Sequence, residues 1–373
     1  MSKHASTQVR PVLIMAGGTG GHVFPALAVA HEILARNIPV IWLGTKQGIE
    51  ARLIPAEGIP VEWVSVSGLR GKRLTRLLKA PFMLTIASWQ CFRVLMRIKP
   101  QVVLGMGGFV TGPGGVMARL MGKPLCIHEQ NAIAGMTNRY LSRIASCVAE
   151  AFPGSFPDSV KTILTGNPVR KDISSMATPE ERFESHSELH RGQINLLVLG
   201  GSLGAQALNE ILPLALAELP QAQRPQVRHQ VGERNIEQAH ECYNKVGLSE
   251  SVELTAFVDD MAGAYEWADL VICRAGALTI AELTAAGIAS ILVPYPYAVD
   301  DHQTRNAMYL VDANAGILIQ QSELDAEVLS DILTKLTNDR EKLLQMACAA
   351  RSLSKPDATR QLADICLDLG AAS

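Results

Sequence analysis

A chain of 373 residues exceeds the length at which a single hydrophobic core stops growing, which indicates two domains. Its formal net charge of −2 lacks the basic footprint of nucleic-acid binding, so no nucleic-acid partner is expected. The seven cysteines are scattered without a CxxC pair or ligand-like spacing, which favours a reducing compartment without structural zinc. The first residues lead into a strand-like run without signal-peptide character, so we expect a cytoplasmic protein.

Apolar strand-like runs followed by helical patterns recur along the chain, which predicts an α/β protein with parallel sheets. The polar stretch 171–193 interrupts this alternation, and we place a domain boundary there. We expect a first Rossmann-like domain over 1–170, a second over 171–344, and a C-terminal helix at about 345–373 that returns to the first. The predicted strands are 12–16, 40–44, 102–105 and 125–128 in the first half, and 196–200, 252–257, 270–273 and 291–294 in the second.

Glycine-rich turns follow four of these strands, at 16–22, 105–115, 200–204 and 273–282. Such turns let a phosphate approach backbone amides at a helix N-terminus. The first turn does not fit GxGxxG, because Val23 stands where the third glycine belongs, and no GxxxxGK[ST] occurs. A nicotinamide enzyme and a P-loop NTPase are therefore disfavoured. Two side chains stand out: His22 at a helix start, and Glu282, which is either a ribose ligand or an ordinary solvated glutamate.

Seven segments in this order resemble the UDP-N-acetylglucosamine:N-acetylmuramyl-(pentapeptide) pyrophosphoryl-undecaprenol N-acetylglucosamine transferases. The resemblance implies a GT-B fold, in which two Rossmann-like domains face a central cleft. It also implies inverting transfer, without a cofactor, of N-acetylglucosamine (GlcNAc) from UDP-GlcNAc to the C4 hydroxyl of the N-acetylmuramyl unit of lipid I, giving lipid II. The segments are AGGTGGHVFPALA (16–28), GMGGFVTGPGG (105–115), HEQNAIAGMTNRYL (128–141), TGNPVR (165–170), GGSLGA (200–205), CRAGALTIAEL (273–283) and DDHQTRNA (300–307).

The resemblance also implies where substrates bind. The second domain would hold the nucleotide, with the backbone of Val258 beside the uracil and Glu282 on the ribose. His302 could share the role of Gln303. The other implied contacts are Ser202, Ala277, Leu278, Thr279, Ile280 and Ala281 for the diphosphate, Asn131, Ala277 and Gln303 for the sugar, Arg170 in the donor site, and Thr19, Gly20 and Gly21 where donor and acceptor meet.

Inverting transfer needs a base for the acceptor hydroxyl, and His22 is our candidate. Glu129 is the competing base. Each has a structural alternative, since His22 could hold a loop carbonyl or an acceptor phosphate and Glu129 could order its loop. No DxD pair stands at a strand end, so we expect no metal and assign the leaving-group charge to helix N-termini.

Residues 68–89 combine five cations with leucines and aromatic residues, which suits contact with an anionic lipid surface. The alternative is a helix that packs its leucines inward. The longest uncharged helical run, 80–92, is too short to span a bilayer. With the resemblance, this indicates peripheral attachment to the cytoplasmic side of the cell membrane and partners among cell-wall synthesis and division proteins.

Two other functions remain open at this point. A UDP-GlcNAc epimerase would use the same donor domain, and its product would distinguish it. A non-catalytic nucleotide-sugar sensor would bind the donor without turnover.

Overall fold

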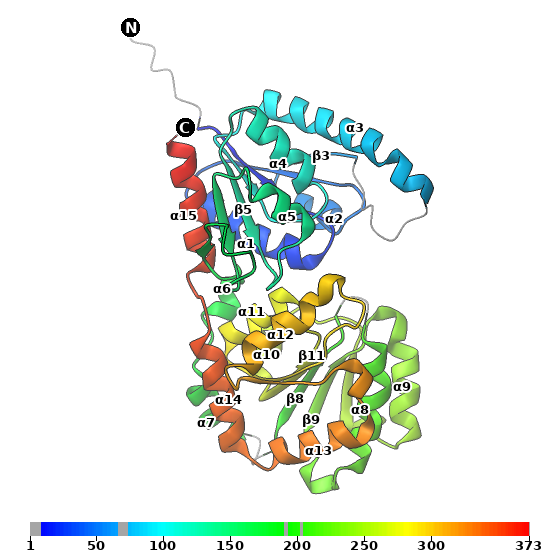
Figure 1. Ribbon diagram of the computed structural model, residues 1–373. Coiled ribbons are helices and arrows are strands. Elements are labelled where there is room, and N and C mark those ends of the chain that lie inside the picture. Colours follow the sequence, from blue (N-terminus) through cyan, green and yellow to red (C-terminus); the bar gives the residue numbers. More distant parts are fainter. Residues whose placement is uncertain (1–8, 66–73, 190–192, 202–203, 373) are drawn as a thin grey trace. The chain divides into compact units, whose positions relative to one another are not determined.

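The computed structural model describes residues 9–65, 74–189, 193–201 and 204–372 (Figure 1). The chain divides into two compact units. The first comprises Met1–Val169 and Asp357–Ser373, and the second comprises Arg170–Pro356.

In the described part of the first unit, seven parallel strands form one sheet in the order β3-β2-β1-β4-β5-β6-β7. The order reverses between β1 and β4, which is where Rossmann-like sheets bind ligands. The strands are β1 (Val12–Met15), β2 (Val40–Gly44), β3 (Val61–Trp63), β4 (Val102–Gly105), β5 (Leu125–Glu129), β6 (Cys147–Glu150) and β7 (Ile163–Leu164).

Helices cover both faces of this sheet, because alternate residues of its central strands point to opposite sides. Val12 and Ile14 join a core under α1 and α15, whereas Leu13 and Met15 join a core under α3 and α4. Figure 1 shows α15 beside α1 and α3 beside α4. The helices are α1 (Gly20–Ala35), α2 (Glu50–Ala56), α3 (Leu74–Ile98), α4 (Thr111–Leu120), α5 (Met136–Leu141) and α15 (Ala358–Ala371).

The described part of the second unit contains a six-stranded parallel sheet, in the order β10-β9-β8-β11-β12-β13, with its reversal between β8 and β11. Its strands are β8 (Asn195–Leu199), β9 (Gln226–Gln230), β10 (Val252–Thr255), β11 (Leu270–Cys273), β12 (Ala289–Leu292) and β13 (Gly316–Leu318). Its α-helices are α6 (Lys171–Ser174), α7 (Pro179–Leu189), α8 (Gln206–Glu218), α9 (Ile236–Lys245), α10 (Met261–Trp267), α11 (Ala277–Ala286), α12 (His302–Val311), α13 (Ala326–Thr337) and α14 (Arg340–Ser352). Short 3-10 turns are η1 (Gln221–Gln223), η2 (Glu233–Asn235), η3 (Ser249–Ser251), η4 (Val299–Asp301) and η5 (Gln321–Glu323).

Two parallel-sheet, Rossmann-like units confirm the predicted fold class, but the C-terminal part of the predicted domain division is wrong. The expected helix 345–373 is two helices: α15 packs against α1 and β4 of the first unit, and α14 packs against α7, α11 and β12 of the second. Leu343 and Met346 of α14 enter the core of the second unit, and Arg351 donates a hydrogen bond to the carbonyl of Ala285. The second unit therefore extends to Pro356 rather than to residue 344.

The polar stretch 171–193, which sequence patterns indicated as a boundary, contributes α6 and α7 to the second unit. Arg182 of α7 donates to the carbonyls of Ala286 and Gly287 at the end of α11, which anchors this stretch. Among the described helices, none combines the length and the apolar character needed to cross a bilayer.

Candidate active site

Two glycine turns lie against each other at the strand-order reversal of the first unit. Gly107 and Gly108 have φ values of +101° and +84°, and a Cβ atom on Gly108 would come within 2.3 Å of the carbonyl oxygen of Gly17. Only glycine tolerates both that backbone conformation and that approach. Glu50, fully buried at the start of α2, accepts hydrogen bonds from the amides of Gly18 and Thr45, each at 3.0 Å. The first turn is thus held from two sides.

Helix α1 begins at this turn. Thr19 is its N-cap, and the Thr19 carbonyl accepts hydrogen bonds from the amides of His22 (3.1 Å) and Val23 (3.2 Å). In the part of the chain that the structure describes, the amides of Gly20 and Gly21 have no partner. Unpaired amides at the positive end of a helix dipole attract anions. Thr19, Gly20 and Gly21 therefore form a helix terminus whose free amides are suited to an anion.

His22 is half-buried in the first turn of α1, and its ring lies against Gly107, where a Cβ atom would come within 2.6 Å of Nδ1. Its Nδ1 is 2.9 Å from Oε1 of Gln130. Its Nε2 has no protein partner within the described residues. One ring nitrogen of His22 is thus held by the protein and the other is available.

Glu129 occupies a different environment from His22. Its carboxylate is buried and accepts hydrogen bonds from four groups: the amide of Asn131 (3.0 Å), Nδ2 of Asn131 (3.2 Å), the amide of Gly135 (3.0 Å) and Nδ2 of Asn138 (2.9 Å). A carboxylate with this many donors has little free capacity to accept a proton from a substrate. The geometry therefore favours the loop-ordering alternative for Glu129, with Asn131 as part of the ordered loop.

Helix α11 starts at the strand-order reversal of the second unit. Gly276 is its N-cap, and the first helical hydrogen bond runs from the amide of Ile280 to the carbonyl of Gly276 at 2.9 Å. The amides of Ala277, Leu278 and Thr279, which precede this bond, have no partner within the described residues. Ala281 follows Ile280 in the same helix. The arrangement is a second helix terminus with free amides, and its geometry is suited to a diphosphate.

Glu282 of α11 is buried, with 8% of its surface exposed, so the solvated-glutamate alternative is wrong. Tyr265 of α10 donates a hydrogen bond to Oε2 at 3.0 Å, and the guanidinium of Arg170 lies 4.0 Å from Oε1. Burial raises the pKa of Glu282 to about 7, although Arg170 and Tyr265 act in the opposite direction. The structure thus brings Arg170 and Glu282 together beside the start of α11.

The remaining predicted contacts fall at the carboxyl ends of strands or at helix starts. Val258 is half-buried after β10. Gln303, in the first turn of α12, accepts a hydrogen bond from the amide of Tyr295 at 2.9 Å, so its own amide group is left to donate. His302 bonds through Nδ1 to the carbonyl of Val299 at 2.8 Å. Ser202 lies outside the described residues.

Sequence patterns did not identify Gln130 and Tyr265, whose side chains contact His22 and Glu282 respectively. Gln130 lies directly after β5, inside the quoted segment HEQN, and that position at a strand end was the available signal. Tyr265 carries no comparable signal, because its role depends on α10 packing beside α11.

Comparisons with known proteins cover nearly the whole chain. Residues 12–150 match the glycosyltransferase family 28 N-terminal domain, and residues 195–362 match the glycosyltransferase family 28 C-terminal domain. A Marinobacter nauticus protein named UDP-N-acetylglucosamine–N-acetylmuramyl-(pentapeptide) pyrophosphoryl-undecaprenol N-acetylglucosamine transferase is 56% identical over 359 residues, which are 96% of this chain and 97% of that protein. A protein of the same name from Alkalilimnicola ehrlichii is 54% identical over 96% of this chain and 98% of its own.

Solved structures also match nearly the whole chain. The crystal structure of Acinetobacter baumannii MurG has a TM-score of 0.82 and 42% identity, and the match covers 96% of this chain and 99% of that one. A putative UDP-N-acetylglucosamine 2-epimerase from Listeria monocytogenes has a TM-score of 0.66 at 14% identity, over 94% of each chain, which is a likeness of fold alone.

Proposed function

This chain belongs to the glycosyltransferase family 28 enzymes named UDP-N-acetylglucosamine–N-acetylmuramyl-(pentapeptide) pyrophosphoryl-undecaprenol N-acetylglucosamine transferase, and we propose that it converts lipid I to lipid II. In this reaction GlcNAc passes from UDP-GlcNAc to the C4 hydroxyl of the N-acetylmuramyl unit, and UDP leaves. The observation that carries the proposal is identity of 56% over 96% of the chain. The epimerase alternative shares only the fold.

The donor nucleotide binds the second unit in this proposal. The free amides that open α11 support diphosphate binding, because three unpaired donors converge at a helix N-terminus. Glu282 accepts hydrogen bonds from the two ribose hydroxyls, supported by its fixed orientation between Tyr265 and Arg170. The backbone of Val258 meets the uracil. The free amide group of Gln303 donates to a sugar hydroxyl, with Ser202 and Asn131 as further contacts.

The first unit supplies the base. Nε2 of His22 removes the proton of the acceptor hydroxyl as its oxygen attacks the anomeric carbon of GlcNAc. The bond from that carbon to the β-phosphate oxygen breaks with its electron pair, so UDP leaves and the configuration inverts. A positioned base of this kind typically contributes about 10²–10⁴-fold to the rate. The free Nε2 of His22 supports this role, and the four donors on Glu129 favour His22 over it.

Helix α3 supports contact with a membrane surface. Phe82, Ile86, Trp89 and Met96 are exposed and follow one another at intervals of four, three and seven residues, so they lie along one stripe with the cation Arg93. An unpartnered apolar stripe with a cation suits an anionic lipid interface. Residues 68–73 of the predicted region lie outside the described residues, as do the side chains of 74–80.

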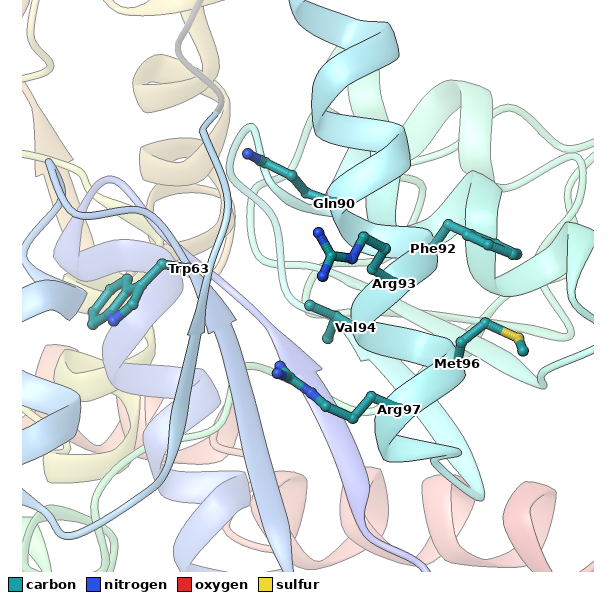
Figure 2. A pocket seen from close by; sticks show the side chains of 7 residues that line it. All are labelled: Trp63, Gln90, Phe92, Arg93, Val94, Met96 and Arg97. Atoms are coloured by element: carbon teal, nitrogen blue, oxygen red, sulfur yellow. The ribbon is translucent and has the colours of Figure 1, made fainter.

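A hollow of about 600 Å³ adjoins the C-terminal half of α3 (Figure 2). Six of its lining residues come from α3, and Trp63 comes from β3. Arg93 and Arg97 point to the side of Trp63, whereas Phe92 and Met96 point to the other side of α3 (Figure 2), so the surface around this half of the helix is both basic and apolar. We assign this surface to peripheral attachment at the cytoplasmic face of the membrane that carries lipid I.

The decisive experiment incubates the purified protein with radiolabelled UDP-GlcNAc and lipid I in the presence of EDTA. Label in a disaccharide lipid is the expected result, because the helix termini meet the leaving-group charge without a metal ion. Conversion of the donor to an epimer, without label in the lipid, would support the epimerase instead. Donor binding without any product would support the sensor. Transfer that appears only after magnesium is restored would overturn metal independence alone.

A further inference from the structure

Gln130 takes no part in the substrate contacts or the catalytic step proposed for this chain. Its side-chain amide is buried between two histidines, His22 and His128. Its Nε2 lies 2.7 Å from the carbonyl oxygen of Met106 and 3.2 Å from Nδ1 of His128. A carbonyl oxygen only accepts hydrogen bonds, so the group that faces Met106 must be the amide NH2. The amide oxygen of Gln130 therefore faces His22.

His128 supports the same orientation from the other side. Its Nε2 lies 3.0 Å from the carbonyl oxygen of Gly166, so Nε2 carries the hydrogen and donates. Burial lowers the pKa of His128 to about 4, so this ring is neutral near pH 7 and its Nδ1 is an acceptor. The NH2 of Gln130 thus faces acceptors only: the carbonyl of Met106 at 2.7 Å, Nδ1 of His128 at 3.2 Å and the carbonyl of His128 at 3.3 Å. Two backbone carbonyls, those of Met106 and Gly166, determine every donor and acceptor in the chain of contacts.

The consequence falls on His22. Its Nδ1 lies 2.9 Å from an oxygen that only accepts, so Nδ1 must carry a hydrogen. In a neutral imidazole the lone pair then stands on Nε2, the nitrogen without a protein partner within the described residues. We propose that Gln130 is a positioning residue that holds His22 in the Nδ1–H tautomer, so that Nε2 is the basic nitrogen. The tautomer assignment rests on the proposed function in one respect only, which is that the acceptor hydroxyl is the group that Nε2 deprotonates.

The arrangement matches both states that a general base passes through. Neutral His22 donates from Nδ1, and the imidazolium formed after proton transfer still donates from Nδ1 to the same oxygen. Only the opposite tautomer is disfavoured, because its Nδ1 lone pair would face the oxygen lone pairs at 2.9 Å. The orienting group is also uncharged. The titratable groups on the neighbouring elements are His128 and Glu129 of β5 and Glu50 of α2, and both carboxylates are occupied by other donors.

The direct test is ¹⁵N NMR of the unliganded protein with labelled histidine, with the His22 signal identified by its loss in His22→Ala. A signal from protonated Nδ1 and unprotonated Nε2 is expected, and the reverse pattern would overturn the proposal. Gln130→Met keeps the side-chain length but removes both the acceptor and the donors. It should mix the two tautomers, whereas Gln130→Glu, which keeps an oxygen opposite Nδ1, should retain the native one.

Kinetics supply the second readout. For Gln130→Met we expect kcat to fall about tenfold or more with the KM for UDP-GlcNAc within about twofold, and Gln130→Glu should recover part of the loss. Gln101→Met is the control, because it makes the same change at a half-buried glutamine of the first unit whose side chain donates to the carbonyl of Arg10. An unchanged kcat in Gln130→Met, or an equal loss in both Gln130 variants with an unaltered tautomer, refutes the positioning role. The NMR result needs no turnover, so it stands even if the wild-type protein transfers no sugar.

Discussion

The affinity for UDP-GlcNAc should rise with pH through neutrality, because Glu282, the proposed ribose ligand, is buried with its pKa raised to about 7. Only the carboxylate form of Glu282 can accept hydrogen bonds from both ribose hydroxyls, so the protein with a protonated Glu282 binds the donor poorly. With a pKa near 7, the ionised fraction is about one tenth at about pH 6 and about nine tenths at about pH 8. Apparent affinity scales with that fraction, which predicts a Kd about tenfold lower at the higher pH.

Titration calorimetry with UDP-GlcNAc across this range measures the effect. The surrounding groups set its position: Arg170 and the Tyr265 hydroxyl favour the carboxylate, and Asp172 opposes it. Tyr265→Phe removes the hydrogen bond and should move the rise to higher pH. Glu282→Gln should bind weakly at every pH without a slope. A wild-type Kd that is flat within about twofold, or a Glu282→Gln slope equal to that of wild type, would refute the reasoning.

Three further outcomes are expected. His22→Ala should lower kcat by about 10²–10⁴-fold while UDP-GlcNAc affinity, measured by calorimetry, stays near wild type. Glu129→Gln should lower the free energy of unfolding in urea by about 1–3 kcal/mol, because an amide NH2 would face donors; a loss of activity without any loss of stability would favour Glu129 as the base. The double variant Phe82→Ser and Trp89→Ser should lower the affinity for anionic vesicles, measured by co-sedimentation, at least about tenfold. The control Leu214→Ser, at an exposed leucine of the second unit, should leave that affinity unchanged. Equal effects of the two changes would contradict a specific membrane-binding surface on α3.

The predicted strands were largely correct, because central strands of parallel sheets are buried on both faces and appear as continuous apolar runs. Residues 40–44, 102–105 and 270–273 are strands with the predicted bounds. Five strands were missed. They include β9, whose sequence QVRHQ is mostly polar, and β7, a two-residue edge strand with both side chains exposed. Edge and polar strands owe their conformation to the neighbours with which they pair, which a local pattern does not contain.

The C-terminal helices illustrate the same limit. The amphipathic pattern extends through residues 341–369, so a single returning helix was a reasonable prediction. The structure ends α14 at Ser352 and starts α15 at Ala358, with Pro356 between them. Which unit each helix joins depends on complementary surfaces, such as the ion pair of Asp364 on α15 with Arg36, the C-cap residue of α1, at 2.5 Å.

The sequence by itself determined the family, the alternation of strands and helices, and the glycine turns that expose helix N-termini. These features are local or directly comparable between sequences, so they need no knowledge of distant contacts. The tertiary structure determined which side chains contact one another. Gln130 stands 108 residues from His22 in sequence, yet the packing of β5 beside the glycine turns places its oxygen 2.9 Å from the imidazole. The protonation state and tautomer of a side chain depend on its neighbours in space, and only the fold supplies them.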